Sequence, residues 1–474
     1  MSTKNKWLTL LVVAVMLGTQ LIVSAIPASA AAPTIDWQKY KGTELSIILN
    51  KHPYSESLIG LLPDFEKATG MTVKYEILAE EEYFQKLRLA LSTNTGQYDA
   101  FMTGPMLEWE YTAGNWLEPL EPFLNDPTKT DQAAYNAADF YPALMAANRW
   151  NKVVGSGIGE GHQWAIPVMV ETYIIPYRAD LYTKYGLKPP VTLPDMSAGA
   201  VVMREKEGGE FYGVVTRGLR TMATVATGFL STMGSYKKTE YADLQVVDGK
   251  FKAALNQPSL VEATGLWVDM IKKAGPPGWT TVTWYDGKEL FASGKYGMYP
   301  DCDFFAASYE NPKTSQVVGK VGYVVSASAP GGTPSSAIWT WALAMSSASK
   351  KKDAAWYLIQ YATSPEALKI GTVKFSNYNP TRKSVFDSPE VQAVFATWGG
   401  GSYTKAVGEN LAKYARLSWT PQPDVFNLGD RWSQALHEIW SGNKTPQQAL
   451  DDCAADVEKM LENDSIVPGP LPEK

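Results

Sequence analysis

The chain has 474 residues, with 43 Lys and Arg, 49 Asp and Glu, three His and two Cys. At roughly 100–200 residues per domain, this length predicts two to four compact units. The net charge of −6 and the lack of a long run of Lys and Arg argue against nucleic acid as a partner. Two Cys exclude a disulfide scaffold, and three scattered His argue against a metal site, so we expect neither a metal nor a cofactor.

The first 30 residues have the pattern of a secretory signal peptide. Lys4 and Lys6 precede an apolar run, and small residues at Ala28 and Ala30 mark a cut after Ala30. A membrane anchor is the alternative, but the apolar run is short for one and a cleavage site follows it. No Cys near the cut could carry a lipid. We therefore predict that residues 1–30 are removed and that the protein is periplasmic and not lipid-anchored.

Strands and helices alternate along the rest of the chain. The predicted elements are strand 44–49, a helix ending at Gly70, strand 71–78, helix 80–92, strands 98–102 and 213–216, helix 262–273, strands 297–299 and 321–325, and helices 353–363 and 446–461. Strands joined to helices by short loops predict a parallel sheet. Tyr83 and Phe84 are placed on the buried face of helix 80–92. Cys453 lies on the apolar stripe of the last helix, and a disulfide to Cys302 stays open as an alternative.

Catalytic signatures are absent from the sequence. We find no nucleophile elbow, zinc-protease motif, P-loop or dinucleotide fingerprint. Asp301 and Asp303 are an acidic pair, but neighbouring positions on one strand cannot face each other across a cleft, as glycoside hydrolysis requires. We therefore do not expect an enzyme.

The aromatic residues are the feature of the sequence that indicates a ligand. Trp339 and Trp341 are two positions apart on a predicted strand, so both side chains should point to one face. Flat aromatic faces suit the C–H surfaces of sugars, while sugar hydroxyls need directional polar partners.

Eight segments, in chain order, resemble motifs of the extracellular solute-binding proteins of family 1, the maltose-binding-protein-like receptors of ABC importers. They are Leu61–Val73, Gly96–Ala100, Trp116–Leu120, Gln163–Pro167 with Glu171-Thr172, Leu290–Lys295, Ala354–Ala367, Asn379–Ser384 and Ser441–Pro446. Tyr98 departs from the family pattern, which usually has Pro there. Each motif alone is weak, but their shared order across the chain is specific.

The resemblance implies a two-lobed α/β periplasmic-binding-protein fold, type II-like, with discontinuous lobes, hinge segments and a ligand cleft between them. Lobe one would comprise residues 31–165 and 342–388, and lobe two residues 166–341 and 389–474. It also implies hinge closure on a small solute, which we expect to be a sugar, and delivery to the permease subunits of an ABC importer by a receptor that we expect to be monomeric.

Loops that follow strand ends face the crevice in open α/β sheets, and the family commonly places ligand contacts there. The candidate ligand-binding residues after strand ends are His52, Tyr54, Thr103, Arg217, Arg220, Asp301 and Asp303. Those at the two crossovers between lobes are Glu171, Tyr173, Trp339 and Trp341, and those in the late loop of lobe two are Trp419 and Phe426. Two alternatives stay open. The same scaffold could bind a polyamine, a phosphate ester or an iron complex, or the protein could be a secreted glycan-active enzyme or a lectin.

Overall fold

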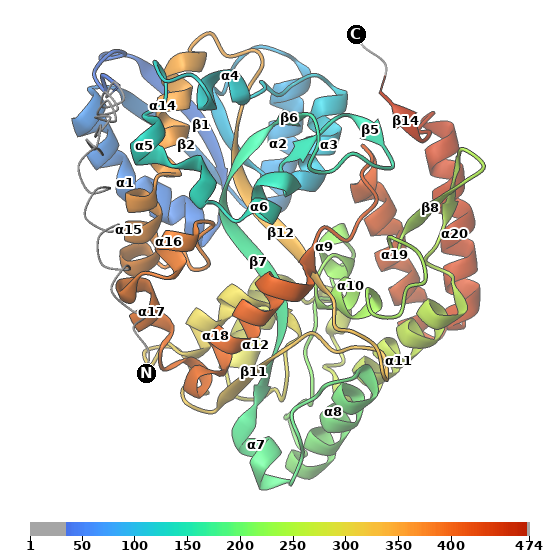
Figure 1. Cartoon of the computed structure of the whole chain (residues 1–474). Helices are drawn as coiled ribbons and strands as arrows, with labels where there is room; N and C mark the ends of the chain where they lie inside the picture. Colours follow the sequence, from blue (N-terminus) through green and yellow to red (C-terminus); the bar gives the residue numbers. More distant parts are fainter. Residues whose placement is uncertain (1–34, 472–474) are drawn as a thin grey trace, which may run out of the picture.

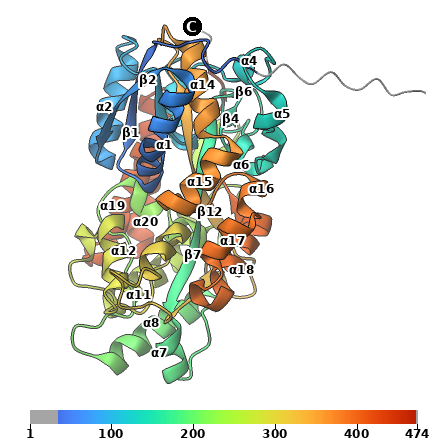
Figure 2. The same cartoon turned by 90° about the vertical axis from the view of Figure 1, so that its left-hand side faces the viewer.

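The structure is a computed structural model that describes residues 35–471, so the predicted signal peptide, residues 1–30, lies outside the described residues. Figure 1 shows two α/β halves, lobe one above and lobe two below, joined near the middle by the long strands β7 (Ala165–Arg178) and β12 (Ser336–Met345). Figure 2, turned by 90°, shows an elongated outline in which β7 runs from one lobe into the other. The two-lobed α/β fold that the resemblance implies is therefore confirmed.

One mixed sheet extends through both lobes in the order β10-β7-β12-β3-β1-β2, with β11 on β7 and β13 on β12. Its other strands are β1 (Glu44–Asn50), β2 (Thr72–Leu78), β3 (Ala100–Thr103), β10 (Asp301–Cys302), β11 (Val321–Val325) and β13 (Ala415–Arg416). Strand β1 pairs in parallel with β2 and β3, as the strand–helix alternation predicts. Strands β10, β11 and β12 run antiparallel to β7, so the prediction of a parallel sheet is wrong there. Strand β12 pairs with the first part of β7, and β10 and β11 pair with its last part in lobe two.

Helices cover the sheet in both lobes (Figure 1). In lobe one they include α1 (Pro53–Thr69), α2 (Glu80–Ser92), α3 (Pro105–Ala113), α14 (Lys352–Ala362) and α15 (Pro365–Phe375). In lobe two they include α8 (Leu193–Glu207), α11 (Pro258–Ala274), α12 (Trp284–Ala292), α18 (Ser402–Glu409), α19 (Val425–Trp440) and α20 (Pro446–Asn463). The predicted helices around 80–92, 262–273, 353–363 and 446–461 are all confirmed.

Two crossing strands and one further segment connect the lobes. Residues 165–172 of β7 pair with β12, whereas residues 173–178 pair with β10 and β11. The further segment lies beside β7, because the backbone N–H of Val170 donates to the carbonyl of Asn379 at 3.3 Å. The predicted lobe limits at 165/166 and 341/342 fall within these two strands. We propose these limits as the boundaries between the lobes.

The predicted strands 213–216 and 297–299 do not form regular strands. These two segments lie side by side, and the N–H of Val215 donates to the carbonyl of Met298 at 2.9 Å, but no continuous ladder follows. A Cβ atom on Gly213 would lie 1.8 Å from the carbonyl oxygen of Ala200, so the segment is packed directly against the backbone of α8. Because the backbone at Gly213 is packed against α8, it does not pair with the neighbouring segment over the length of a regular strand.

The last helix has the predicted start. Thr445 accepts a hydrogen bond from the N–H of Gln448 at 3.2 Å, and Gln448 accepts one from the N–H of Thr445 at 3.1 Å. Cys453 is buried, as predicted, but it is a free thiol like Cys302, so the alternative of a disulfide is wrong. Within residues 35–471, no helix combines the length and the apolar character that a membrane span requires.

Candidate ligand-binding site

A cavity of about 330 Å³ lies between the lobes. Its lining residues come from both lobes and from both crossing strands. They are His52, Glu80, Glu81, Phe84, Gln85, Arg88, Glu171, Tyr173, Arg217, Arg220, Thr221, Met222, Ala223, Ala226, Thr227, Trp284, Phe304, Phe305, Trp339, Trp341, Phe426, Asn427 and Asp430. Ligand pockets typically measure about 300–1,000 Å³, so this cavity suits a solute at the small end of that range.

The crossing strands form one wall of the cavity. Trp339 of β12 lies opposite Glu171 of β7 in the sheet register. The rings of Trp339 and Trp341 meet edge to face with centroids 5.0 Å apart, which confirms that both point to one side. The indole N–H of Trp341 donates to Oε1 of Glu171 at 2.8 Å. Oε2 of Glu171 accepts no hydrogen bond from the described residues and is available to a solute.

His52 links the first loop of lobe one to this wall. Its Nδ1 accepts the backbone N–H of Tyr54 at 3.2 Å and thereby caps α1. The ring proton therefore belongs on Nε2, which lies 3.4 Å from Oε1 of Glu171. Nε2 makes no hydrogen bond in the described residues, so His52 approaches the Oε1 side of Glu171 without a hydrogen bond to it.

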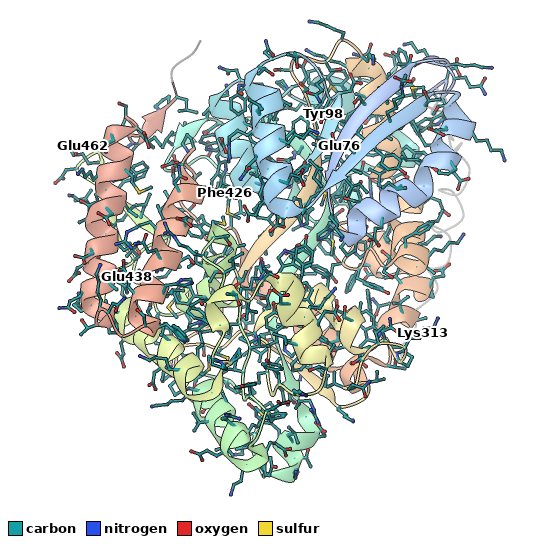
Figure 3. All side chains as sticks on the ribbon, turned by 180° about the vertical axis from the view of Figure 1, so that it is seen from behind. Glu76, Tyr98, Lys313, Phe426, Glu438 and Glu462 are labelled. Atoms are coloured by element: carbon teal, nitrogen blue, oxygen red, sulfur yellow. The ribbon has the colours of Figure 1, made fainter. Side chains whose placement is uncertain are left out.

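Aromatic side chains from opposite lobes meet at the cavity. Phe84 of α2 and Phe426 at the start of α19 contact edge to face, with ring centroids 5.7 Å apart. Phe84 also lies nearly parallel to Trp341, at 6.5 Å and 16°. Phe426, labelled in Figure 3, lies between the C-terminal helices and α2 when the molecule is seen from behind. This contact joins the two lobes at the cavity.

A second aromatic group lines the part of the cavity near α12. Trp284 stacks on Phe305 at 5.7 Å and 10°, and Phe304 lies 5.3 Å from the ring of His52. Beside them, the hydroxyl of Tyr285 donates to the carbonyl of Lys51 at 3.2 Å, which is a direct hydrogen bond between lobes.

Each arginine of the cavity is paired with its own carboxylate. Arg88 binds Glu110 through two N–H groups, Arg217 binds Asp301 at 2.9 and 2.7 Å, and Arg220 binds Asp430 at 3.2 and 2.8 Å. The cavity therefore contains many donors without a matching excess of positive charge. That arrangement is suited to neutral hydroxyl groups more than to an anion.

Two carboxyl groups of α2 face the same space. Burial raises the pKa of Glu80 to about 7, the charge of Arg217 opposes this rise, and Glu171 and Glu81 add to it. Burial also raises the pKa of Glu81. Near neutral pH, Glu80 can therefore either donate or accept a hydrogen bond.

Eight of the predicted site residues line the cavity: His52, Glu171, Tyr173, Arg217, Arg220, Trp339, Trp341 and Phe426. The structure places the other five elsewhere: Tyr54, Thr103, Asp301, Asp303 and Trp419. We therefore carry only the first eight forward as proposed ligand contacts.

All five displaced residues are buried, and three of them pack within a single lobe. Tyr54 is in the first turn of α1, and Thr103 ends β3 opposite Ala342. Trp419 packs edge to face on Trp432 of α19, with ring centroids 6.0 Å apart. For each of them, packing within a single lobe takes the side chain away from the cleft.

The two aspartates serve the scaffold separately. Asp301 lies behind Arg217, whereas Asp303 accepts hydrogen bonds from Thr172 at 2.6 Å and from Asn379 at 2.7 Å in the hinge. They do not face each other across the cleft, in agreement with the argument from strand geometry against a glycosidase pair.

Several lining residues were not predicted, among them Phe84, Trp284 and Glu80. Phe84 is half-buried, while Tyr83, Leu87 and Leu91 fill the buried face of α2. Residues 83, 87 and 91 are spaced four apart and define the buried face of the helix. Phe84 follows Tyr83 by one residue, a rotation of about 100° around the helix axis, so its side chain points to one edge of that face. This offset could have indicated from the sequence that Phe84 is not part of the core.

Comparisons with known proteins agree with this geometry. The model of the family described as bacterial extracellular solute-binding protein matches residues 51–369. An erythritol/L-threitol-binding protein of Mycolicibacterium smegmatis is 31% identical over 422 residues, covering 88% of this chain and 86% of that protein. A mannitol-binding protein of Pseudomonas aeruginosa is 26% identical over 306 residues, covering 63% of this chain and 64% of that protein.

Solved structures show the same fold. The crystal structure of an ABC transporter solute-binding protein from Agrobacterium vitis with bound D-mannitol has a TM-score of 0.72 and 26% sequence identity, covering 90% of this chain and 100% of that chain. The family whose model matches this chain consists of solute-binding proteins, which agrees with the expectation that the protein is not an enzyme. The chain belongs to the bacterial extracellular solute-binding protein family.

Proposed function

We propose that the protein captures a small neutral sugar or polyol outside the cytoplasm and delivers it to the permease subunits of an ABC importer. The observation that carries this proposal is the cavity between the lobes, where aromatic faces alternate with arginines that are each neutralised by a carboxylate. Aromatic faces cover C–H surfaces, and the open N–H and carboxylate groups bind hydroxyls.

The size of the cavity favours a monomeric solute over a long oligosaccharide. Its volume is about 330 Å³, and Phe84 and Phe426, which come from opposite lobes, contact each other in its lining. The relatives that bind erythritol, L-threitol and mannitol support a short polyol or a monosaccharide. Transport requires release as well as capture, so we expect a dissociation constant of about 1 µM, near −8 kcal/mol.

Capture works by closure of the lobes. Residues of both lobes line the cavity, so a solute between them contacts more groups in the closed form than in an open form. Such a solute shifts the equilibrium toward closure by its difference in affinity for the two forms. The permease would then recognise the closed receptor. We further propose a monomer that is exported to the periplasm, with residues 1–30 removed and no lipid anchor.

A thermal-shift screen of the purified mature protein tests the proposal. Erythritol, L-threitol, ribitol, D-mannitol and common monosaccharides should include at least one solute that raises the melting temperature, because a ligand stabilises the form that it binds. Polyamines, phosphate esters and iron complexes form the comparison set. A shift confined to that set would contradict the proposal.

A further inference from the structure

Arg217 and Asp301 form a buried ion pair at the cavity wall. Nε of Arg217 donates to Oδ2 of Asp301 at 2.9 Å, and Nη2 donates to Oδ1 at 2.7 Å. The side chains are 10% and 1% exposed. Oδ1 of Asp301 also accepts the backbone N–H of Cys302 at 2.7 Å, so the carboxylate is fixed from behind.

The opposite edge of the guanidinium faces the cavity. Arg217 lines the cavity, and its Nη1 group donates to none of the described residues. Glu80 of lobe one also lines the cavity. It forms no ion pair with Arg217 within the described part of the chain, although the charge of Arg217 opposes the rise in the pKa of Glu80. Glu171 and Tyr173 of β7 also line the cavity. Within residues 35–471, Asp301 is the only carboxylate that forms an ion pair with Arg217, and it binds the other edge of the guanidinium.

The charge of this edge decides which solutes it accepts. A guanidinium without a bound carboxylate is a strong partner for phosphate and carboxylate groups, because its planar fork matches them in two-point hydrogen bonds. A guanidinium already bound to a buried carboxylate keeps its outer N–H donors, but the pair carries no net charge. Such an edge donates to hydroxyl oxygens and offers little attraction to an anion.

We infer that Asp301, which does not line the cavity, sets the solute selectivity of the cleft by neutralising Arg217, so that the receptor accepts neutral polyols and rejects their phosphorylated forms. The inference rests on the proposed function, and it assigns Asp301 a positioning and charge-balancing role instead of a direct contact. It also explains why this aspartate is buried behind the cavity wall.

The test compares two neutral solutes with their phosphates. Calorimetry measures the affinities of erythritol, D-mannitol, erythritol 4-phosphate and mannitol 1-phosphate for the wild type and for Asp301→Asn. The wild type should prefer a neutral polyol over its phosphate by at least about 100-fold. Asp301→Asn, which keeps the shape but not the charge, should narrow this preference at least tenfold, with a rise in phosphate affinity.

A matched control removes the same kind of pair outside the cavity. Arg178 is also 10% exposed and is bound by Asp180 at 2.8 and 2.6 Å, but neither residue lines the cavity. Asp180→Asn should leave both affinities and the preference unchanged. An equal gain of phosphate binding in Asp180→Asn would overturn the inference, because it would show a general effect of added positive charge.

A double variant provides a second test, which can be used if Asp301→Asn alone does not fold. In the double variant Arg217→Gln with Asp301→Asn, both charges are removed together, so phosphate affinity should not rise above that of the wild type. A rise in the double variant, or an unchanged preference in folded Asp301→Asn, would overturn the inference. A wild type that binds no sugar or polyol would instead refute the proposed function, and that result is seen before any variant is made.

Discussion

Glu171 of β7 and Trp341 of β12 are held together by the indole N–H of Trp341, which donates to Oε1 of Glu171 at 2.8 Å. This bond occupies one carboxylate oxygen, and Nε2 of His52 lies 3.4 Å from the same oxygen without a hydrogen bond to it. The other oxygen accepts no hydrogen bond from the described residues. The pair therefore combines a flat apolar face with a hydrogen-bond acceptor at one place in the cleft.

Glu171→Gln should weaken binding of the best neutral solute at least tenfold, about 1.4 kcal/mol. The amide can keep the bond from Trp341, but it replaces the open acceptor with a donor. Calorimetry checks the affinity. Glu121→Gln is the matched control, because Glu121 also accepts one short bond, from the N–H of Gln163 at 2.8 Å, and does not line the cavity. Equal affinities in wild type and Glu171→Gln would remove Glu171 from the site.

Trp341→Ala should also weaken sugar or polyol binding at least tenfold, and the protein should remain folded. Trp341 is 3% exposed and contacts Trp339, His52 and Phe84, so truncation removes an aromatic face of the cavity. Trp341→Phe keeps a ring but loses the N–H bond to Glu171 and should be intermediate. Calorimetry with circular dichroism separates affinity from folding, and unchanged affinity in folded Trp341→Ala would contradict the assignment.

Gly104→Ala should reduce affinity through Trp339. A Cβ atom at Gly104 would lie 2.6 Å from Cζ2 of Trp339, so the indole must move. The backbone of Gly104 is extended, with φ of −158°, and accepts an alanine without strain. Gly278→Ala is the control, because nothing lies within 4 Å of its added Cβ. The affinity for the best polyol should fall several-fold for Gly104→Ala alone, and a shift in tryptophan fluorescence should accompany the fall.

Phe84→Ala should speed release of the solute. Phe84 contacts Phe426 of the other lobe, so its loss removes an interlobe contact that would oppose opening of the lobes. Stopped-flow fluorescence should show a higher dissociation rate with a smaller change in the association rate. Phe386→Ala serves as the control, since Phe386 is also half-buried and packs on Phe395 away from the cavity. An unchanged dissociation rate in Phe84→Ala would rule out the closing contact.

Asp303→Asn should change the pH dependence of stability. Burial raises the pKa of Asp303 to about 7, with Glu171 adding to the rise, while hydrogen bonds from Thr172 oppose it. Because the folded pKa lies above the unfolded value of about 3.9, Asp303 favours folding below that value, and this contribution is lost as the pH rises to about 7. The melting temperature of the variant relative to wild type should therefore increase between pH 4 and pH 8, by a few degrees. A constant difference across this range would contradict the prediction.

The sequence predicted those parts of the fold whose signals are local. The apolar strand at β1, the capping box of Thr445 and the paired indoles of Trp339 and Trp341 each depend on residues close together in the chain. The antiparallel strands on β7 could not be predicted in this way, because their direction is set by where the chain crosses between lobes.

The candidate site was predicted only in part, because only some of its residues have a signal in the nearby sequence. Positions after strand ends indicated His52 and Arg217, and the first crossover indicated Glu171; all three line the cavity. The same rule could not separate Arg217 from Asp301 behind it, because which of two paired side chains faces the space depends on packing across three segments. Trp419 has no local signal that distinguishes a buried indole from an exposed one, and its burial follows from contact with Trp432.

Small-angle X-ray scattering of the mature protein, with and without a saturating amount of the neutral sugar or polyol that gives the largest thermal shift, tests the central claim most directly. Closure of two lobes on a solute predicts a smaller radius of gyration in the loaded sample, and the solute recovered afterwards is chemically unchanged. Identical scattering curves for the empty and the saturated protein, or a chemically altered solute, would contradict the account.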